Sequence, residues 1–199
     1  VNIDAQAMME SGVEQLVAQG CRRLALLAWG HTADGFAGCL AAHGLEFRPQ
    51  WCRHDLEPSL PGAGWEEFRE IWAAYPEKPD GMVILDDLLA DDAAKAIAEL
   101  RLQVPEQLRL VVLANRGSGI DFPFPATRLE VDPGEVARLL GAMLLDLLDG
   151  RPVTQPEQVL PFKVIPAEPD DGRPSEVPQT IDTGVPTRSK PETKGVLVQ

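Results

Sequence analysis

Residues Ser11 to Gly30 read SGVEQLVAQGCRRLALLAWG, and this stretch decides the fold. Its first half places apolar residues at the spacing of an α-helix, and Gly20 is the residue type that ends helices in a left-handed conformation. Its second half, Leu24 to Trp29, is apolar throughout instead of alternating with polar residues. Such a run is typical of a parallel strand that is covered on both faces. The stretch therefore predicts a helix followed by a buried strand of an α/β protein.

The same order of elements repeats further along the chain. We expect a helix from Thr32 or Asp34 to Gly44, a weak strand in EFRPQWC, a helix around Phe68, buried strands at Gly81 to Asp86 and Leu108 to Ala114, and the alanine-rich helix LADDAAKAIAEL between these strands. Strands that alternate with helices predict a doubly wound parallel sheet. Ligands of such sheets bind beyond the carboxyl ends of the strands.

The last third of the chain predicts a short strand, TRLEV, and a long helix after it. Asp132, Pro133 and Glu135 form a capping arrangement at the start of this helix. Its apolar stripe, Val136, Leu139, Leu140, Met143, Leu144 and Leu147, needs a partner surface. A strand in QVLPFKVI follows. From Ala167 to Gln199, proline and polar residues dominate without apolar periodicity, which predicts a disordered tail.

Composition excludes several classes of partner. The 199 residues carry a net charge of -13, which repels nucleic acid and anionic membranes. No apolar run is long enough to span a bilayer, and the first thirty residues are patterned as helix and strand, unlike a signal peptide. Cys21, Cys39 and Cys52 fall in or beside predicted core elements, so we expect reduced, buried thiols and a cytoplasmic protein.

Motifs for catalysis, cofactors and metals are missing from the sequence. AWGHTADGF contains neither GxGxxG nor GK[ST], and no serine lies in a GxSxG elbow. His31, His43 and His54 are scattered along the chain and predict surface histidines instead of a metal site. We therefore expect a protein that is not an enzyme and that needs neither cofactor nor metal.

Polar and aromatic side chains follow the predicted strands. Asp86 and Asp87 end a central strand, where paired carboxylates can bind Mg²⁺, accept a phosphoryl group or hold ligand hydroxyls. The alternative is that Asp87 caps the next helix while Asp86 is solvated. Trp29 and Phe36 flank a strand-to-helix loop, where aromatic rings either stack on a ligand or pack in the core.

Five segments, in order, resemble the lactose-repressor (LacI/GalR) family of bacterial transcription regulators. They are GVEQLVAQGCRRLALLAWG, DGFAGCLAAHGL, PDGMVILDDLLADDAAKAIAELRLQVPEQLRLVVL, FPATRLEVDPGEVARLLGAMLLDLLDGRP and QVLPFKVIPAE. The first is similar to the family's helix-glycine-basic-strand segment. The second is similar to its Arg-x-x-Gly-aromatic helix, and the third to its stretch of strand, Asn-Asp, helix, VPED and strand. Together they cover Val1 to about Ala167.

The resemblance implies the effector-binding domain of a repressor, with the two-lobed fold of periplasmic sugar-binding proteins. Residues 1–166 would hold the complete C-terminal lobe. The helix from Pro133 to Leu148 and the strand before it would belong to an N-terminal lobe whose first half is missing. Residues 167–199 would be the tail. The domain would close on a small, sugar-like effector and form a homodimer through the helix from Leu88 to Leu100. It would reach DNA only through an upstream domain absent from this chain.

The chain departs from the family at several effector-contacting positions. The family's arginine falls on Thr32, its Asn-Asp becomes Asp86-Asp87, and its Gly-aromatic-Asp-Asp stretch becomes Val112 to Asn115. A hydrogen-bonding site loses about 1 to 3 kcal/mol for each buried group left unpaired, so the effector should differ from the family's usual sugar. The residues that we expect to line the cleft are Trp29, Thr32, Phe36, Asp86 and Asn115. The family also prefers glycine where this chain has Arg101.

Two other functions stay open from the sequence. The first is the substrate-binding protein of a sugar ABC transporter, which uses the same fold and would carry an upstream signal peptide. The second is a doubly wound enzyme that uses Asp86 and Asp87 with a metal.

Overall fold

The computed structural model describes residues 1–120, 122–153 and 157–167. Its elements are β1 (Asn2–Ile3), α1 (Ala5–Ala18), β2 (Leu24–Leu27), α2 (Ala33–Ala42), the 3-10 helix η1 (Pro49–Trp51), β3 (Cys52–Arg53), α3 (Ala63–Ala74), β4 (Gly81–Ile84), α4 (Asp87–Leu100), β5 (Arg109–Asn115), β6 (Thr127–Val131), α5 (Pro133–Leu148), β7 (Val159–Leu160) and β8 (Lys163–Ile165). Apart from Ala167, the predicted tail lies outside the described residues.

A six-stranded sheet in the order β3-β2-β4-β5-β6-β8 forms the centre of the molecule. Its first five strands are parallel, and β8 joins β6 antiparallel. Counted from β2, the parallel strands follow the order 2-1-3-4-5 of doubly wound folds, with the change of direction between β2 and β4. The predicted α/β fold with a doubly wound parallel sheet is confirmed.

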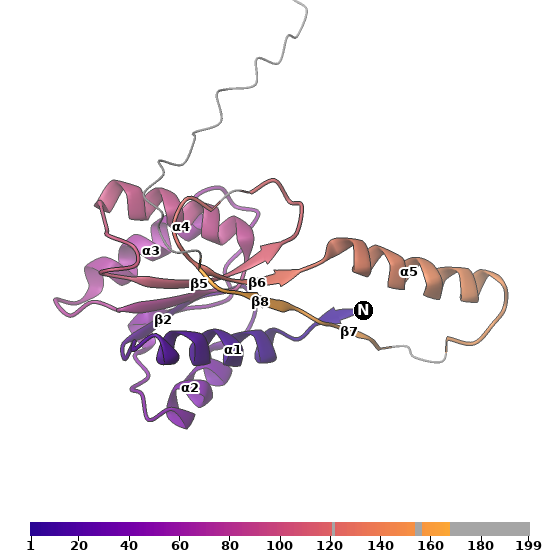
Figure 1. Cartoon of the computed structure of the whole chain (residues 1–199), viewed down its shortest axis with the longest axis horizontal. Coiled ribbons are helices and arrows are strands. Elements are labelled where there is room, and N and C mark those ends of the chain that lie inside the picture. Colours follow the sequence, from indigo (N-terminus) through magenta and orange to yellow (C-terminus); the bar gives the residue numbers. More distant parts are fainter. Residues whose placement is uncertain (121, 154–156, 168–199) are drawn as a thin grey trace, which may run out of the picture.

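Two helical layers bury the sheet on both faces (Figure 1). Leu24 and Leu26 point toward α1 and α2, whereas Ala25 and Leu27 point toward α3 and α4. The alternation comes from the two-residue period of a strand, and it explains why β2 is apolar at every position. Gly64 lets α3 approach α4 closely, because a Cβ on it would lie 2.5 Å from the carbonyl oxygen of Leu89.

Two of the expected strands are altered by proline. The weak strand expected in EFRPQWC is reduced to β3, because η1 begins at Pro49. The strand expected in QVLPFKVI is split at Pro161, which has no backbone N–H to donate to a strand ladder. Its first part, β7, pairs in parallel with β1 in a separate two-stranded sheet, and its second part, β8, pairs with β6.

A projecting arm, made of α5 with β7 and β1, leaves the body of the molecule (Figure 1). The expectation that the strand TRLEV belongs, with the helix after it, to a separate N-terminal lobe is not met, because TRLEV forms β6 and pairs with β5 in the six-stranded sheet. Asp132 caps α5 as predicted, accepting from the Gly134 N–H at 2.9 Å. Glu135 does not complete a capping box, because its carboxylate pairs with Arg138 instead.

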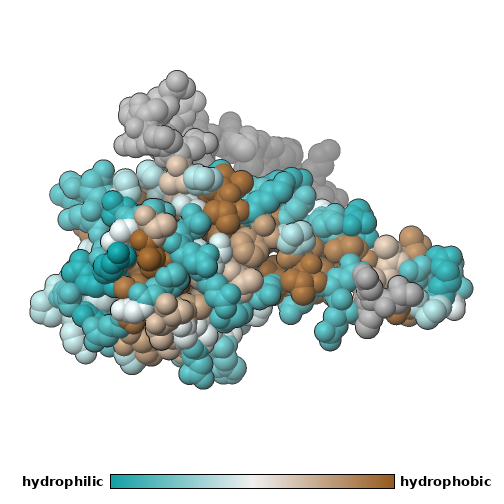
Figure 2. All heavy atoms as spheres, turned by 60° about the horizontal axis from the view of Figure 1, so that its bottom comes forward, coloured by the Kyte–Doolittle hydropathy of each residue, from teal (hydrophilic) through white to brown (hydrophobic). Residues whose placement is uncertain are grey.

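The apolar stripe of α5 is largely exposed. Val136 and Leu139, at its base, pack against the core, but none of the sixteen residues of α5, all of which are described, is fully buried. Its exposed leucines are Leu140, Leu144, Leu145, Leu147 and Leu148. Figure 2 shows apolar side chains at the base of the projecting arm and along it. Exposed apolar residues gathered on one helix in this way are typical of contact sites between proteins.

We expect the 199-residue chain to associate through this surface of α5. Leu144→Glu places a charge on it and should shift the chain toward monomer in size-exclusion chromatography with light scattering. Leu60→Glu is the matched control, because Leu60 is as exposed (59%) as Leu144 (57%) but lies in the loop before α3. A monomeric unaltered chain, or equal effects of the two variants, would contradict this expectation.

Helix α4 ends on Arg101 in the left-handed conformation, at φ 54° and ψ 41°. This is the position at which the family resemblance predicted a glycine. A residue with a Cβ is strained there, whereas glycine is not. We expect Arg101→Gly to raise the free energy of unfolding by about 0.5 to 1 kcal/mol in urea denaturation. Arg101→Ala keeps the strain and should bring no gain, so equal stability of the two variants would refute the explanation.

Candidate functional site

A cavity of about 490 Å³ lies at the carboxyl ends of β2, β4 and β5. This volume is in the range of sites for small molecules. The cavity is lined by Val1, Asn2, Ile3, Asp4, Ala5, Met8, Trp29, Thr32, Leu85, Leu113, Val136 and Leu160. It lies where the strand order changes direction, which is the ligand position of doubly wound sheets.

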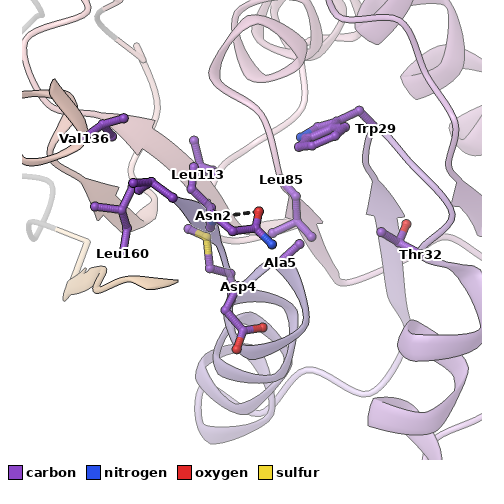
Figure 3. A pocket seen from close by; sticks show the side chains of 12 residues that line it. Asn2, Asp4, Ala5, Trp29, Thr32, Leu85, Leu113, Val136 and Leu160 are labelled. Atoms are coloured by element: carbon purple, nitrogen blue, oxygen red, sulfur yellow. Dashed lines mark hydrogen bonds between the residues drawn. The ribbon is translucent and has the colours of Figure 1, made fainter. Parts of the chain in front are cut away.

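The cavity has one wall from the sheet and one from the projecting arm (Figure 3). Trp29 and Thr32 follow β2 on one side, and Val136 and Leu160 come from the arm on the other. Asp4, at the start of α1, lies between them. The residues of the sheet wall come together because parallel strands present all their carboxyl ends at one edge of the sheet.

Apolar side chains dominate the lining, with Asn2, Asp4 and Thr32 as its polar members. Two of these already have backbone partners. The side-chain oxygen of Asn2 accepts from the Ile3 N–H, and Asp4 caps α1 by accepting from the Ala7 N–H, each at 2.9 Å. Each of these bonds uses one oxygen, so the second Asp4 carboxylate oxygen and the Asn2 amide N–H groups are the polar atoms that these two side chains can still offer a ligand, while Trp29 is 54% exposed.

The structure separates the five predicted cleft residues. Trp29 and Thr32 line the cavity. Phe36 does not, because it is 1% exposed in the core and packs edge to face on Phe47. We therefore leave Phe36 out of the site. Asp86 and Asn115 are half-buried and do not line the cavity, although Asp86 directly follows the lining residue Leu85 and Asn115 lies two positions after the lining residue Leu113.

Asp86, and not Asp87, caps α4. The Asp86 Oδ1 accepts from the N–H groups of Leu88 and Leu89, at 2.9 and 3.0 Å. Asp87 lies in the first turn of the helix and accepts from the Asn115 side chain at 2.9 Å. Asp86 thus takes the capping role expected of Asp87, whereas Asp87 does not take the cleft-lining role expected of Asp86. Both carboxylates have N–H donors as partners, which gives no support to a Mg²⁺ ion held between them.

The carboxyl group of Asp86 lies in an unfavourable environment for its charge. Burial raises the pKa of Asp86, two backbone N–H donors counteract this effect in part, and the nearby charge of Asp87 raises the pKa further. A raised pKa in the folded protein means that the charged form opposes folding, so stability is lost as the pH rises through that pKa.

Residues missed by the sequence analysis come from the start of the chain and from the arm. Asn2, Asp4, Val136 and Leu160 line the cavity although no motif marks them. They reach it because β1 pairs with β7, a contact between residues far apart in the sequence. No local signal in the sequence could have found them.

Comparisons with known proteins identify the fold. Residues 13–168 match the family described as periplasmic binding protein-like domain. Among solved structures, a complex of the transcriptional regulator CelR with cellobiose is 20% identical, with a TM-score of 0.70 over 83% of this chain and 52% of that chain. The Escherichia coli transcriptional repressor ascG is 20% identical, with a TM-score of 0.67 over 84% of this chain and 62% of that one.

A LacI family transcriptional regulator from Mycobacterium smegmatis is 22% identical, with a TM-score of 0.65 over 83% of this chain and 63% of that chain. This chain thus spans between about half and two thirds of the length of these structures. No curated protein matches the chain significantly. Among the described residues, the structure contains no helix that is both long and apolar enough to cross a membrane.

We expect Asp86→Asn to leave the free energy of unfolding at pH 7 unchanged or raised, because asparagine keeps the capping oxygen without the disfavoured charge. Asp86→Ala removes the cap and should cost about 1 kcal/mol. Urea denaturation at neutral pH and again toward acid checks this. Any advantage of Asp86→Asn over the unaltered chain should shrink as Asp86 takes up its proton. Equal losses in the two variants would mean that capping is not the role of Asp86.

Proposed function

The chain belongs to the periplasmic binding protein-like domain family, and we propose that it is the small-molecule-sensing domain of a transcription regulator of the lactose-repressor type. The observation that carries the proposal is the cavity between the sheet and the projecting arm. Solved structures that share this fold include transcriptional regulators, one of them in complex with cellobiose. In this proposal the domain binds a ligand and performs no reaction.

The mechanism follows from the two walls of the cavity. Trp29 and Thr32 are carried by the body, and Val136 and Leu160 by the projecting arm. A ligand that contacts both walls binds best at one arm angle, and it shifts the population of the domain toward that angle. The change would be passed to DNA through a domain outside this chain. The acidic charge of this chain is consistent with DNA binding elsewhere.

The chemistry of the cavity favours an apolar or aromatic ligand over a free sugar. A sugar needs many hydrogen bonds, whereas the lining has only three polar side chains, and one oxygen each of Asn2 and Asp4 is already bonded to the backbone. Trp29 provides a ring face on which an aromatic ligand can stack. This agrees with the departures from the family pattern at Thr32 and Asn115. We therefore propose a small neutral molecule with an aromatic body as the effector.

We expect neutral aromatic alcohols and aldehydes to raise the melting temperature of the chain more than cellobiose does at equal concentration. Trp29→Ala should weaken the binding of the best compound by about tenfold, because it removes the stacking face. Isothermal titration calorimetry measures the affinities. Tyr75→Ala is the control, since Tyr75 is an exposed aromatic residue at the C-terminal end of α3 and does not line the cavity.

Two results would speak against this proposal. If Trp29→Ala and Tyr75→Ala bound the best compound equally well, the cavity would not be the binding site. If cellobiose bound more tightly than every aromatic compound, the site would be a sugar site despite its lining. Reading the DNA upstream of the Val1 codon separates a regulator, with a DNA-binding segment there, from a transport receptor, with a signal peptide.

A homodimer through α4, as the resemblance implies, is part of the proposal. Leu88 and Leu100 are the exposed large apolar residues of this helix, and Lys95 pairs with Asp91 and Asp92. This surface is smaller and more charged than the leucine surface of α5. Leu88→Glu, compared with Leu144→Glu by light scattering, distinguishes association through α4 from association through α5.

A further inference from the structure

Two histidines and an aspartate meet at the carboxyl ends of β2 and β3. The Nδ1 atoms of His31 and His54 lie 2.8 and 2.6 Å from one and the same oxygen, Oδ2 of Asp55. One nitrogen of each imidazole and a carboxylate oxygen all lie within 4.8 Å of one another. The scattering of the histidines along the sequence predicted surface residues instead of such a cluster. Parallel pairing of β2 with β3 brings His31 and His54 together.

The backbone holds the two loops of this cluster in place. Leu27 of β2 is in register with Arg53 of β3, so the two loops that follow start side by side. The N–H of Asp55 then donates to the carbonyl oxygen of Gly30 at 3.1 Å. Asp55 itself has a positive φ of 57°, a conformation that aspartate adopts more readily than most residues. The three side chains are therefore gathered before any ligand arrives.

We propose that His31, His54 and Asp55 bind one divalent transition-metal ion of the Zn²⁺ class. Imidazole nitrogen and carboxylate oxygen are the usual ligands of Zn²⁺ in proteins, together with thiolate. Ligand atoms about 2.1 Å from a tetrahedral Zn²⁺ lie about 3.4 Å apart. The two nitrogen-oxygen distances in the cluster, 2.8 and 2.6 Å, are shorter than this value, and the three ligand atoms all lie within 4.8 Å of one another. Small side-chain rotations therefore suffice to accept the ion.

The exposure of the three side chains makes these rotations possible. The His31 side chain is 94% exposed, and those of His54 and Asp55 are 37% and 38% exposed. On binding, the ion takes the place of the protons between each Nδ1 and Oδ2, and the neutral imidazoles carry their proton on Nε2. The net charge of -13 on the chain favours a cation.

Three protein ligands leave one position of a tetrahedral ion open. His31 lies in the sequence between Trp29 and Thr32, which both line the cavity, but none of the three proposed ligands lines it. The open position of the ion takes water or an oxygen of a bound small molecule. Binding of the ion stands on the cluster alone and does not depend on the effector proposed above.

Isothermal titration of the full 199-residue chain with ZnCl₂, in buffer without chelators, tests the site. We expect one ion for each chain. His31→Ala and His54→Ala should each weaken binding by at least about tenfold, and Asp55→Asn should weaken it while keeping the left-handed backbone conformation. His43→Ala is the control, because His43 is an exposed histidine at the end of α2, outside the cluster.

The proposal is overturned if Zn²⁺ shows no saturable binding at one ion per chain. It is also overturned if the double variant His31→Ala with His54→Ala binds Zn²⁺ as tightly as the unaltered chain, or if His43→Ala lowers the affinity as much as His31→Ala does. The three residues lie outside both core clusters, so circular dichroism should show that every variant remains folded.

Discussion

Asp80 joins the beginnings of three neighbouring strands, and the geometry of the sheet depends on it. Its carboxylate accepts from the backbone N–H groups of Arg22 and Arg23, at 3.0 and 2.8 Å. Its own N–H donates to the Arg23 carbonyl oxygen, and its carbonyl oxygen accepts from the Arg109 N–H. The amino ends of β2, β4 and β5 are thus aligned by one residue. Because these three strands are parallel, their carboxyl ends point toward one edge of the sheet, where the cavity lies.

The second constraint is that a strand buried on both faces needs two helical layers. The body satisfies this requirement, with α1 and α2 on one face and α3 and α4 on the other. The projecting arm is covered less completely, because five leucines of α5 are exposed. The same asymmetry gives the cavity its two walls. A change in the angle of the arm moves Val136 and Leu160 relative to Trp29 and so alters the cavity.

Only a small part of the candidate site could be placed from the sequence, and only to the level of a strand end. Trp29 and Thr32 follow a recognisable buried strand, and a doubly wound sheet puts such residues at the ligand edge. Phe36 follows the same strand, yet one helical turn directs it into the core, where it meets Phe47. The capping role of Asp86 in place of Asp87 has a similar origin, because the backbone angles at Asp86 put its carboxylate opposite the helix N–H groups.

The sequence alone determined the helices and strands of the body and the layered α/β fold, because apolar periodicity and the glycines and capping residues at element ends are local signals. It also indicated the reduced state of the cysteines, all three of which are free and buried. Tertiary structure decided which distant residues meet. Pairing of β1 with β7 closed the cavity, and pairing of β2 with β3 gathered His31, His54 and Asp55. Strand pairing between distant segments is set by the packing of the whole chain, and therefore no short stretch of sequence records it.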